Sequence, residues 1–167
     1  EQLSRYALYM ATLGNRPDLF PGSDYVGKYI TNPPTDYDVP EEYLENETFA
    51  AILSEAEKYL GYPYVWGGSS PATSFDCSGF VSWVINHSGW DVGRLGAQGL
   101  YNICTPTSTP HPGDLVFFVG TYDTPGVSHC GIYVGDGMMI HCGDPISYAN
   151  LNSSYWQSHF YAYGRLP

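Results

Sequence analysis

The sequence predicts an α+β fold in which two N-terminal helices pack on a small antiparallel sheet. Apolar residues follow helical spacing from Thr48 to Gly61 and again from Cys77 to His87. Beyond Asp91 they fall instead in short segments that are rich in β-forming residues and bounded by Gly, Pro or Asp. Helices therefore come first and strands follow, without the strand–helix alternation of a parallel sheet.

Two segments differ in composition, and the boundary between them is expected at Thr48. Residues 1–47 include the run "NRPDLFPGSDYVGKYITNPPTDYDVP", whose Pro and Gly residues argue against long regular elements. We interpret this segment as a linker or an N-terminal extension, and its aromatic residues favour packing on the main domain. Residues 48–167 are expected to form that main domain.

The first helix of the main domain is expected to bury one apolar face and to carry charged residues on the other. Thr48 is the expected N-cap, Gly61 the expected stop, and Pro63 prevents continuation of the helix. The following run "YPYVWGGSSPATS" is typical of a loop. A second helix is expected from Cys77 to His87, with Gly89 ending it.

Four strands are expected after the second helix, in "DLVFFVG", "SHCGIYVG", "GMMIHCG" and "HFYAYGRL". The run "GDG" between the second and third strands is a hairpin signal. Because side chains alternate along a strand, His129 and His141 are expected on one face of this hairpin. Cys130 and Cys142 then lie on the opposite face, so the two His–Cys pairs are not expected to bind a metal ion.

Composition indicates one globular domain and excludes several classes of partner. Of the 167 residues, 43% are apolar and 16% aromatic, and seventeen acidic against six basic residues give a net charge of −11. That charge argues against nucleic acid as a partner. No apolar run approaches the roughly 20 residues of a membrane span. The polar opening "EQLSR" indicates no signal peptide, which fits either a cytoplasmic protein or a fragment of a longer exported one.

Cys77 is the candidate nucleophile, since it lies in the first turn of the second helix, in the run "SFDCSGF". A helix N-terminus favours the thiolate, and the Cys77 N–H can help to form an oxyanion hole. His129 is the candidate base, and His141 would hold the His129 ring in the productive tautomer. The chain has four cysteines but no CxxC pair, so we expect no zinc knuckle, no disulfide and no cofactor.

The motifs "YVWGGSSPATSFDCSGFVSWV", "HPGDLVFF", "VSHCGIYVGDGMMIHC" and "YGRL" resemble, in type and order, those of the NlpC family of cell-wall cysteine endopeptidases, over residues 48–167. The resemblance implies a papain-like fold and hydrolysis of bacterial peptidoglycan stem peptides, usually between γ-D-glutamate and the diamino acid that follows (diaminopimelate or Lys). It implies Cys77 as nucleophile, His129 as base and His141 as orienting group, with a thioester acyl-enzyme. It also implies action outside the cell, at the wall, within a longer multidomain protein.

The resemblance further implies substrate-binding residues around the nucleophile. Tyr64 of the YxWGG element corresponds to a tyrosine close to that nucleophile, and Trp66 is expected to line the groove or to serve packing alone. Asp76 and Ser78 correspond to positions that bind the free amine of an N-terminal L-alanine. Asp76 fits equally well as a plain helix cap, and one residue can do both.

One departure from the family concerns the loop after the second helix. In "GRLGAQG", Arg94 and Gln98 match a family motif, and Arg94 is a candidate substrate-binding residue, but Gly96 replaces the expected hydroxyl residue. This difference leaves the stem-peptide preference open. Two other functions also stay open: a papain-like amidase or acyltransferase with the same residues, and a wall-binding module that has lost turnover.

Overall fold

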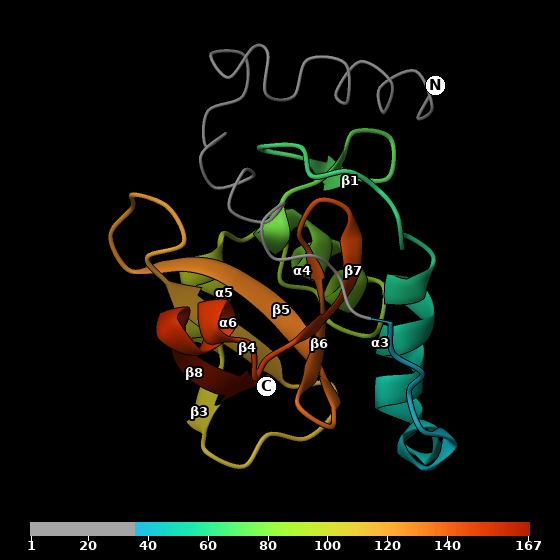
Figure 1. Ribbon diagram of the computed structural model, residues 1–167. Helices are drawn as coiled ribbons and strands as arrows, with labels where there is room; N and C mark the ends of the chain where they lie inside the picture. Colours follow the sequence, from blue (N-terminus) through green and yellow to red (C-terminus); the bar gives the residue numbers. More distant parts are fainter. Residues whose placement is uncertain (1–35) are drawn as a thin grey trace.

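The computed structural model describes residues 36–167 and confirms the α+β class (Figure 1). The elements in chain order are η2 (Glu41–Glu45), α3 (Glu47–Glu57), β1 (Ser69–Ser70), β2 (Ser74–Phe75), α4 (Cys77–Asn86), α5 (Ala97–Ile103), β3 (Thr105–Thr107), β4 (Leu115–Val119), β5 (Val127–Gly135), β6 (Met138–Cys142), β7 (Ile146–Asn150), α6 (Ser154–His159) and β8 (Phe160–Arg165). Within this part of the chain, no helix is both long enough and apolar enough to cross a membrane.

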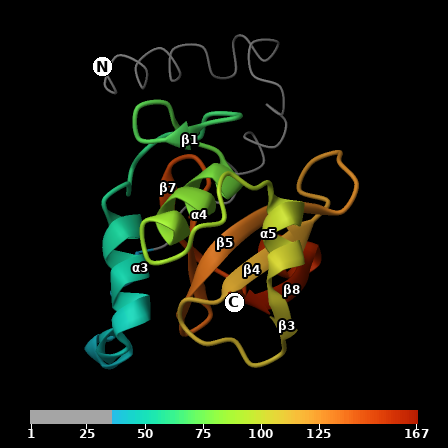
Figure 2. The same cartoon turned by 180° about the vertical axis from the view of Figure 1, so that it is seen from behind.

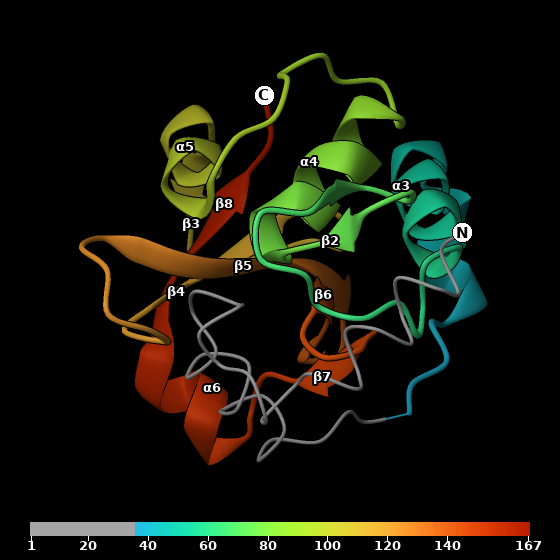
Figure 3. The same cartoon turned by 90° about the horizontal axis from the view of Figure 1, so that it is seen from above.

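The strands form a six-stranded antiparallel sheet in the order β3-β8-β4-β5-β6-β7, and β1 and β2 form a separate small pair. Helices α3, α4 and α5 lie on one face of the large sheet, whereas α6 lies on the opposite face (Figure 3). The view from behind shows α4 and α5 in front of β5 (Figure 2). The sheet is therefore covered on both faces, and α4 contacts its central strands.

The two predicted helices are present, but α3 ends at Glu57, before the predicted stop at Gly61, and its start also differs from the prediction. Helix α3 buries the apolar face that its periodicity predicts, including Phe49 and Ile52. The prediction of Thr48 as its N-cap is wrong, because the Asn46 side chain accepts the Phe49 N–H at 3.0 Å and the helix begins at Glu47. Helix α4 begins at Cys77 as predicted and ends at Asn86, one residue early.

All four predicted strands are confirmed as β4, β5, β6 and β8, and the "GDG" turn joins β5 to β6. Asp136 and Gly137 both have positive φ angles, +54° and +74°, as a tight hairpin turn requires. Seven elements were not predicted, namely η2, β1, β2, α5, β3, β7 and α6. His159, expected to open the last strand, instead ends α6.

The described part of the N-terminal segment contacts the β5–β6 hairpin. Tyr37 donates its hydroxyl proton to the Val134 carbonyl at 3.1 Å, and Tyr43 donates to the Asp136 carboxylate at 2.8 Å. Residues 36–46 therefore pack on the domain that follows. Residues 1–35 lie outside the described residues, so the predicted division at residues 47 and 48 stays a prediction.

Candidate active site

Cys77 lies at the N-terminus of α4, where the preceding residue caps the helix. The Asp76 carboxylate accepts the Gly79 N–H at 2.7 Å, so the proposed role as a helix cap is confirmed. Gly79 permits a close approach of the chain, since a Cβ there would lie 2.0 Å from the Gly68 carbonyl oxygen. The Cys77 side chain is buried, and Cys77 Sγ lies 3.9 Å from the Ser128 carbonyl oxygen.

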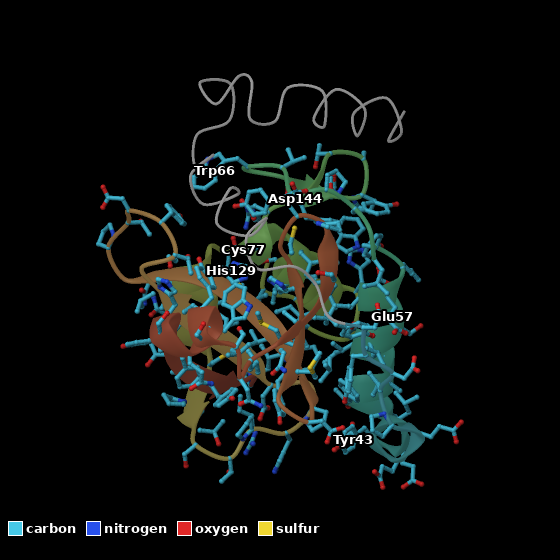
Figure 4. All side chains as sticks on the ribbon, in the orientation of Figure 1. Tyr43, Glu57, Trp66, Cys77, His129 and Asp144 are labelled. Carbon is cyan, nitrogen blue, oxygen red and sulfur yellow. The ribbon has the colours of Figure 1, made fainter. Side chains whose placement is uncertain are left out.

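His129 directly follows Ser128 in β5, and Figure 4 shows it close to Cys77 where α4 meets the sheet. His129 Nε2 lies 3.0 Å from His141 Nδ1, so the two imidazoles are hydrogen-bonded as well as buried. The prediction that they are neighbours on one face of the hairpin is thus confirmed. Gly131 leaves space on this face, because a Cβ there would lie 2.7 Å from Met139 Sδ and 3.1 Å from the His141 Cβ.

Burial makes both imidazoles weak bases. It holds the pKa of His129 well below its usual value, and the neighbouring His141 lowers that pKa further. Burial alone lowers the pKa of His141 to about 3. Both rings are therefore neutral near pH 7, which is the state in which a histidine can accept a proton from a thiol.

Trp156 covers the histidine pair, and sequence reasoning missed it. This α6 side chain is 1% exposed, and its ring stacks on His129 with centroids 5.3 Å apart and planes 23° apart. It also meets His141 edge-on at 5.1 Å and Phe118 at 4.6 Å. No sequence motif indicates this contact, because it depends on the position of α6 on the face of the sheet opposite α4.

Three of the predicted substrate-binding residues form one polar network at the start of α4. Arg94 Nη2 donates to both carboxylate oxygens of Asp76 at 2.9 Å, and Arg94 Nη1 donates to Ser78 Oγ at 2.8 Å. Charge-assisted hydrogen bonds of this kind hold both groups in place. The loop from Arg94 and the first turn of α4 are thereby joined beside Cys77, although only Asp76 and Ser78 are near Cys77 in the sequence.

The two predicted aromatic residues differ in exposure. Tyr64 is 2% exposed, and its backbone forms an isolated β-bridge with Phe75, next to the start of α4. Burial raises the pKa of its hydroxyl, and the charges of Cys77 and Asp76 raise that pKa further. Trp66 is 36% exposed, and its ring meets that of Tyr122 edge-on at 5.2 Å. Tyr122 carried no signal in the sequence, because it lies in the irregular loop between β4 and β5.

Within residues 36–167, the other cysteines and the two histidine–cysteine pairs form neither a disulfide nor a metal site. All four cysteines lie in the described part of the chain and are free thiols. Burial raises the pKa of Cys104 to about 12 and the pKa values of Cys130 and Cys142 well above the usual value. Among residues 36–167, no group of three acidic, His or Cys side chains is arranged to hold a metal ion.

A cysteine at a helix tip, together with histidines on a neighbouring antiparallel sheet, is typical of the papain-like class of fold. The model of the NlpC/P60 family matches residues 61–165, so the chain belongs to the NlpC/P60 family. It is 39% identical over 146 residues to the Bifunctional muramidase/DL-endopeptidase CwlT of Bacillus subtilis (strain 168), covering 86% of this chain and 44% of that protein. It is 44% identical over 117 residues to the Probable endopeptidase p60 of Listeria seeligeri, covering 69% of this chain and 22% of that protein.

The same fold occurs, with a TM-score of 0.70, in a solved structure from Staphylococcus aureus subsp. aureus Mu50. That protein is described as similar to a lipoprotein and as a member of the NLP/P60 family. It is 42% identical, and the match covers 80% of this chain and 43% of that chain. This chain thus spans less than half the length of these three relatives. The predicted family and the papain-like fold are confirmed.

Proposed function

We propose that the chain is the catalytic domain of a cysteine endopeptidase that hydrolyses bacterial peptidoglycan stem peptides between γ-D-glutamate and the following diamino acid. The observation that carries the proposal is the 3.0 Å hydrogen bond between His129 and His141, together with the position of Cys77 Sγ 3.9 Å from the carbonyl oxygen of Ser128, the residue before His129. The name DL-endopeptidase of the CwlT relative supports the choice of bond. The match to the NlpC/P60 family model over residues 61–165 includes Cys77, His129 and His141.

Acylation begins with His129 in its neutral form, because burial lowers the pKa of its imidazole. His129 Nε2 is hydrogen-bonded to His141, so Nδ1 is the nitrogen that takes the Cys77 proton. The Cys77 sulfur then attacks the peptide carbonyl carbon, and the carbonyl π electrons move to oxygen. The N-terminal end of α4 stabilises this oxyanion through the Cys77 backbone N–H and the helix dipole.

Collapse of the tetrahedral adduct breaks the carbon–nitrogen bond. Protonated His129 donates its proton to the leaving amine, and a thioester on Cys77 remains. In the second half, His129 takes a proton from water, the hydroxyl attacks the thioester carbon, and the thiolate leaves. Return of the proton to sulfur restores the thiol and the neutral imidazole.

The substrate is proposed to bind across the start of α4. Asp76, Ser78 and Arg94 supply charges and a hydroxyl there, and Tyr64 and Trp66 supply aromatic surface. Because the network already contains a guanidinium and a carboxylate, it can orient the charged ends of a short peptide. The bacterial cell wall is then the site of action. The relatives named above are longer proteins, and a place within a longer multidomain protein is part of the proposal.

The test is digestion of purified peptidoglycan, with mass spectrometry of the released fragments. Cys77→Ala is expected to abolish release, because no other group replaces the sulfur. Cys104→Ala is the matched control, since this thiol is partly buried and its pKa is raised to about 12. Release of stem-peptide fragments by the Cys77→Ala variant at the rate of the unchanged chain would contradict the proposal. Release of acyl-transfer products or of amidase products would instead favour the other open enzyme classes.

A further inference from the structure

Two loops that are distant in the sequence meet through their aromatic tips near Cys77. The first, residues 62–68, connects α3 to β1, and the second, residues 120–126, connects β4 to β5. The rings of Trp66 and Tyr122 contact each other edge-on, with centroids 5.2 Å apart and planes 81° apart. Figure 4 shows Trp66 on the same side of the molecule as Cys77.

The first loop is fixed to the two residues that precede Cys77. The Val65 N–H donates to the Phe75 carbonyl at 2.8 Å, and the Gly67 N–H donates to the Asp76 carboxylate at 3.1 Å. Trp66 lies between these two anchored residues. Its backbone therefore has little freedom to move away from the start of α4.

The second loop is fixed to the residue that precedes His129. Thr121 Oγ1 lies 2.6 Å from Ser128 Oγ, and the Thr121 N–H donates to the same oxygen at 3.1 Å. The Ser128 carbonyl oxygen is the atom 3.9 Å from Cys77 Sγ. At the end of the loop, the Val127 N–H donates to Gln98 Oε1 at 2.9 Å. Both loops are thus bonded to direct neighbours of the nucleophile and its base.

Both rings keep surface that no part of the core covers. Trp66 is 36% exposed, and Tyr122 is only partly buried. Burial raises the pKa of Tyr122, and the charge of Cys77 raises it further, which agrees with a phenol that lies within the electric field of the thiol. Two contacting aromatic side chains held above a thiol by fixed loops are typical of a binding wall, because rigid aromatic surface gains contact at little entropic cost.

We propose that Trp66 and Tyr122 together form an aromatic wall of the substrate groove, and that Tyr122 is a specificity-determining residue. The wall packs on the aliphatic carbon chain of the amino acid that adjoins the scissile bond. This inference rests on the proposed function, since it takes a stem peptide as the ligand. It adds Tyr122 and its loop to the residues that the family motifs supply.

The experiment measures KM and kcat for a synthetic stem peptide, with a second readout that needs no substrate. Tyr122→Ala is expected to raise KM about fivefold to tenfold with little change in kcat, whereas Tyr122→Phe retains the ring and most of the affinity. The rate at which iodoacetamide alkylates Cys77 should not fall in either variant. Tyr161→Ala is the matched control, because Tyr161 on β8 makes a similar edge-on ring contact with Tyr101 on α5, with centroids 5.2 Å apart, outside the site.

A KM for Tyr122→Ala within about 1.5-fold of the unchanged chain would overturn the inference. So would a fall in the alkylation rate equal to the fall in kcat/KM, since the loop would then only support the nucleophile. If the chain without substitutions cleaves no stem peptide, the proposed function fails. A measurement of peptide binding then tests the aromatic wall separately from the proposed function. Cys77→Ala protein that binds the peptide, and binds it at least threefold more weakly with Tyr122→Ala added, would support the wall. Equal binding by both proteins would refute it.

Discussion

Trp156→Ala tests whether α6 supports the histidine pair. The side chain is 1% exposed and packs on His129, His141 and Phe118 with ring centroids at 5.3, 5.1 and 4.6 Å. Replacing a fully buried tryptophan with alanine removes its burial and leaves a cavity, at a cost of about 3–5 kcal/mol. Each lost aromatic pair accounts for ~0.5–1.5 kcal/mol of that cost. Against a typical stability of about 5–15 kcal/mol, the loss is large.

The assay is urea unfolding at pH 7, followed by circular dichroism so that the lost tryptophan does not change the signal. Trp156→Phe should lose clearly less, because a ring still covers His129. Trp66→Ala is the matched control: this tryptophan is 36% exposed, and its removal should cost under ~1 kcal/mol. A loss below about 2 kcal/mol for Trp156→Ala would refute the packing described for α6.

Two further predictions concern the same pair of histidines. His141→Ala should lower kcat by roughly 10²- to 10⁴-fold with little effect on KM, because the buried His129 loses the partner that fixes its tautomer. His141→Asn retains a hydrogen-bond acceptor, so its kcat should fall less. Steady-state kinetics checks this, and a kcat for His141→Ala within threefold of the original would contradict it. Stability should fall as the pH drops below ~6.5, because the unfolded histidines then bind protons that the folded ones, with lowered pKa values, do not. Urea unfolding at pH 7, 6 and 5 should show a loss approaching about 1.4 kcal/mol per pH unit for each histidine, and constant stability would be inconsistent with neutral buried rings.

Local signals made the central parts of the site predictable from sequence. Asp76 begins α4 because its side chain caps the helix over three residues, and that interaction needs no tertiary context. The relation of His129 to His141 follows from two strands, one short turn and the alternation of side chains. The prediction of Thr48 as the cap of α3 was wrong, because Asn46 is also a capping residue type and lies only two positions earlier, so residue type alone does not locate the helix start.

Contacts set by the path of the chain were beyond sequence reasoning. Helix α6 has six residues and no side-chain cap, so nothing local marks it as a helix or aims Trp156 at the histidines. Tyr122 reaches Trp66 only because Thr121 and Ser128 hold the loop between them. The family motifs identify the residues that react, whereas the residues that surround them depend on tertiary packing.

The hydrogen bonds of Asp76 bear on how it can recognise a substrate. One carboxylate oxygen accepts the Gly79 N–H and the Ser78 hydroxyl, the other accepts the Gly67 N–H, and Arg94 donates to both. A carboxylate has about four lone-pair sites, so these five bonds leave little capacity for another donor. An ammonium group that bound Asp76 would have to share the carboxylate with Arg94, whose side chain is 38% exposed and has room to shift. Recognition of a free L-alanine amine by Asp76 therefore requires Arg94 to move.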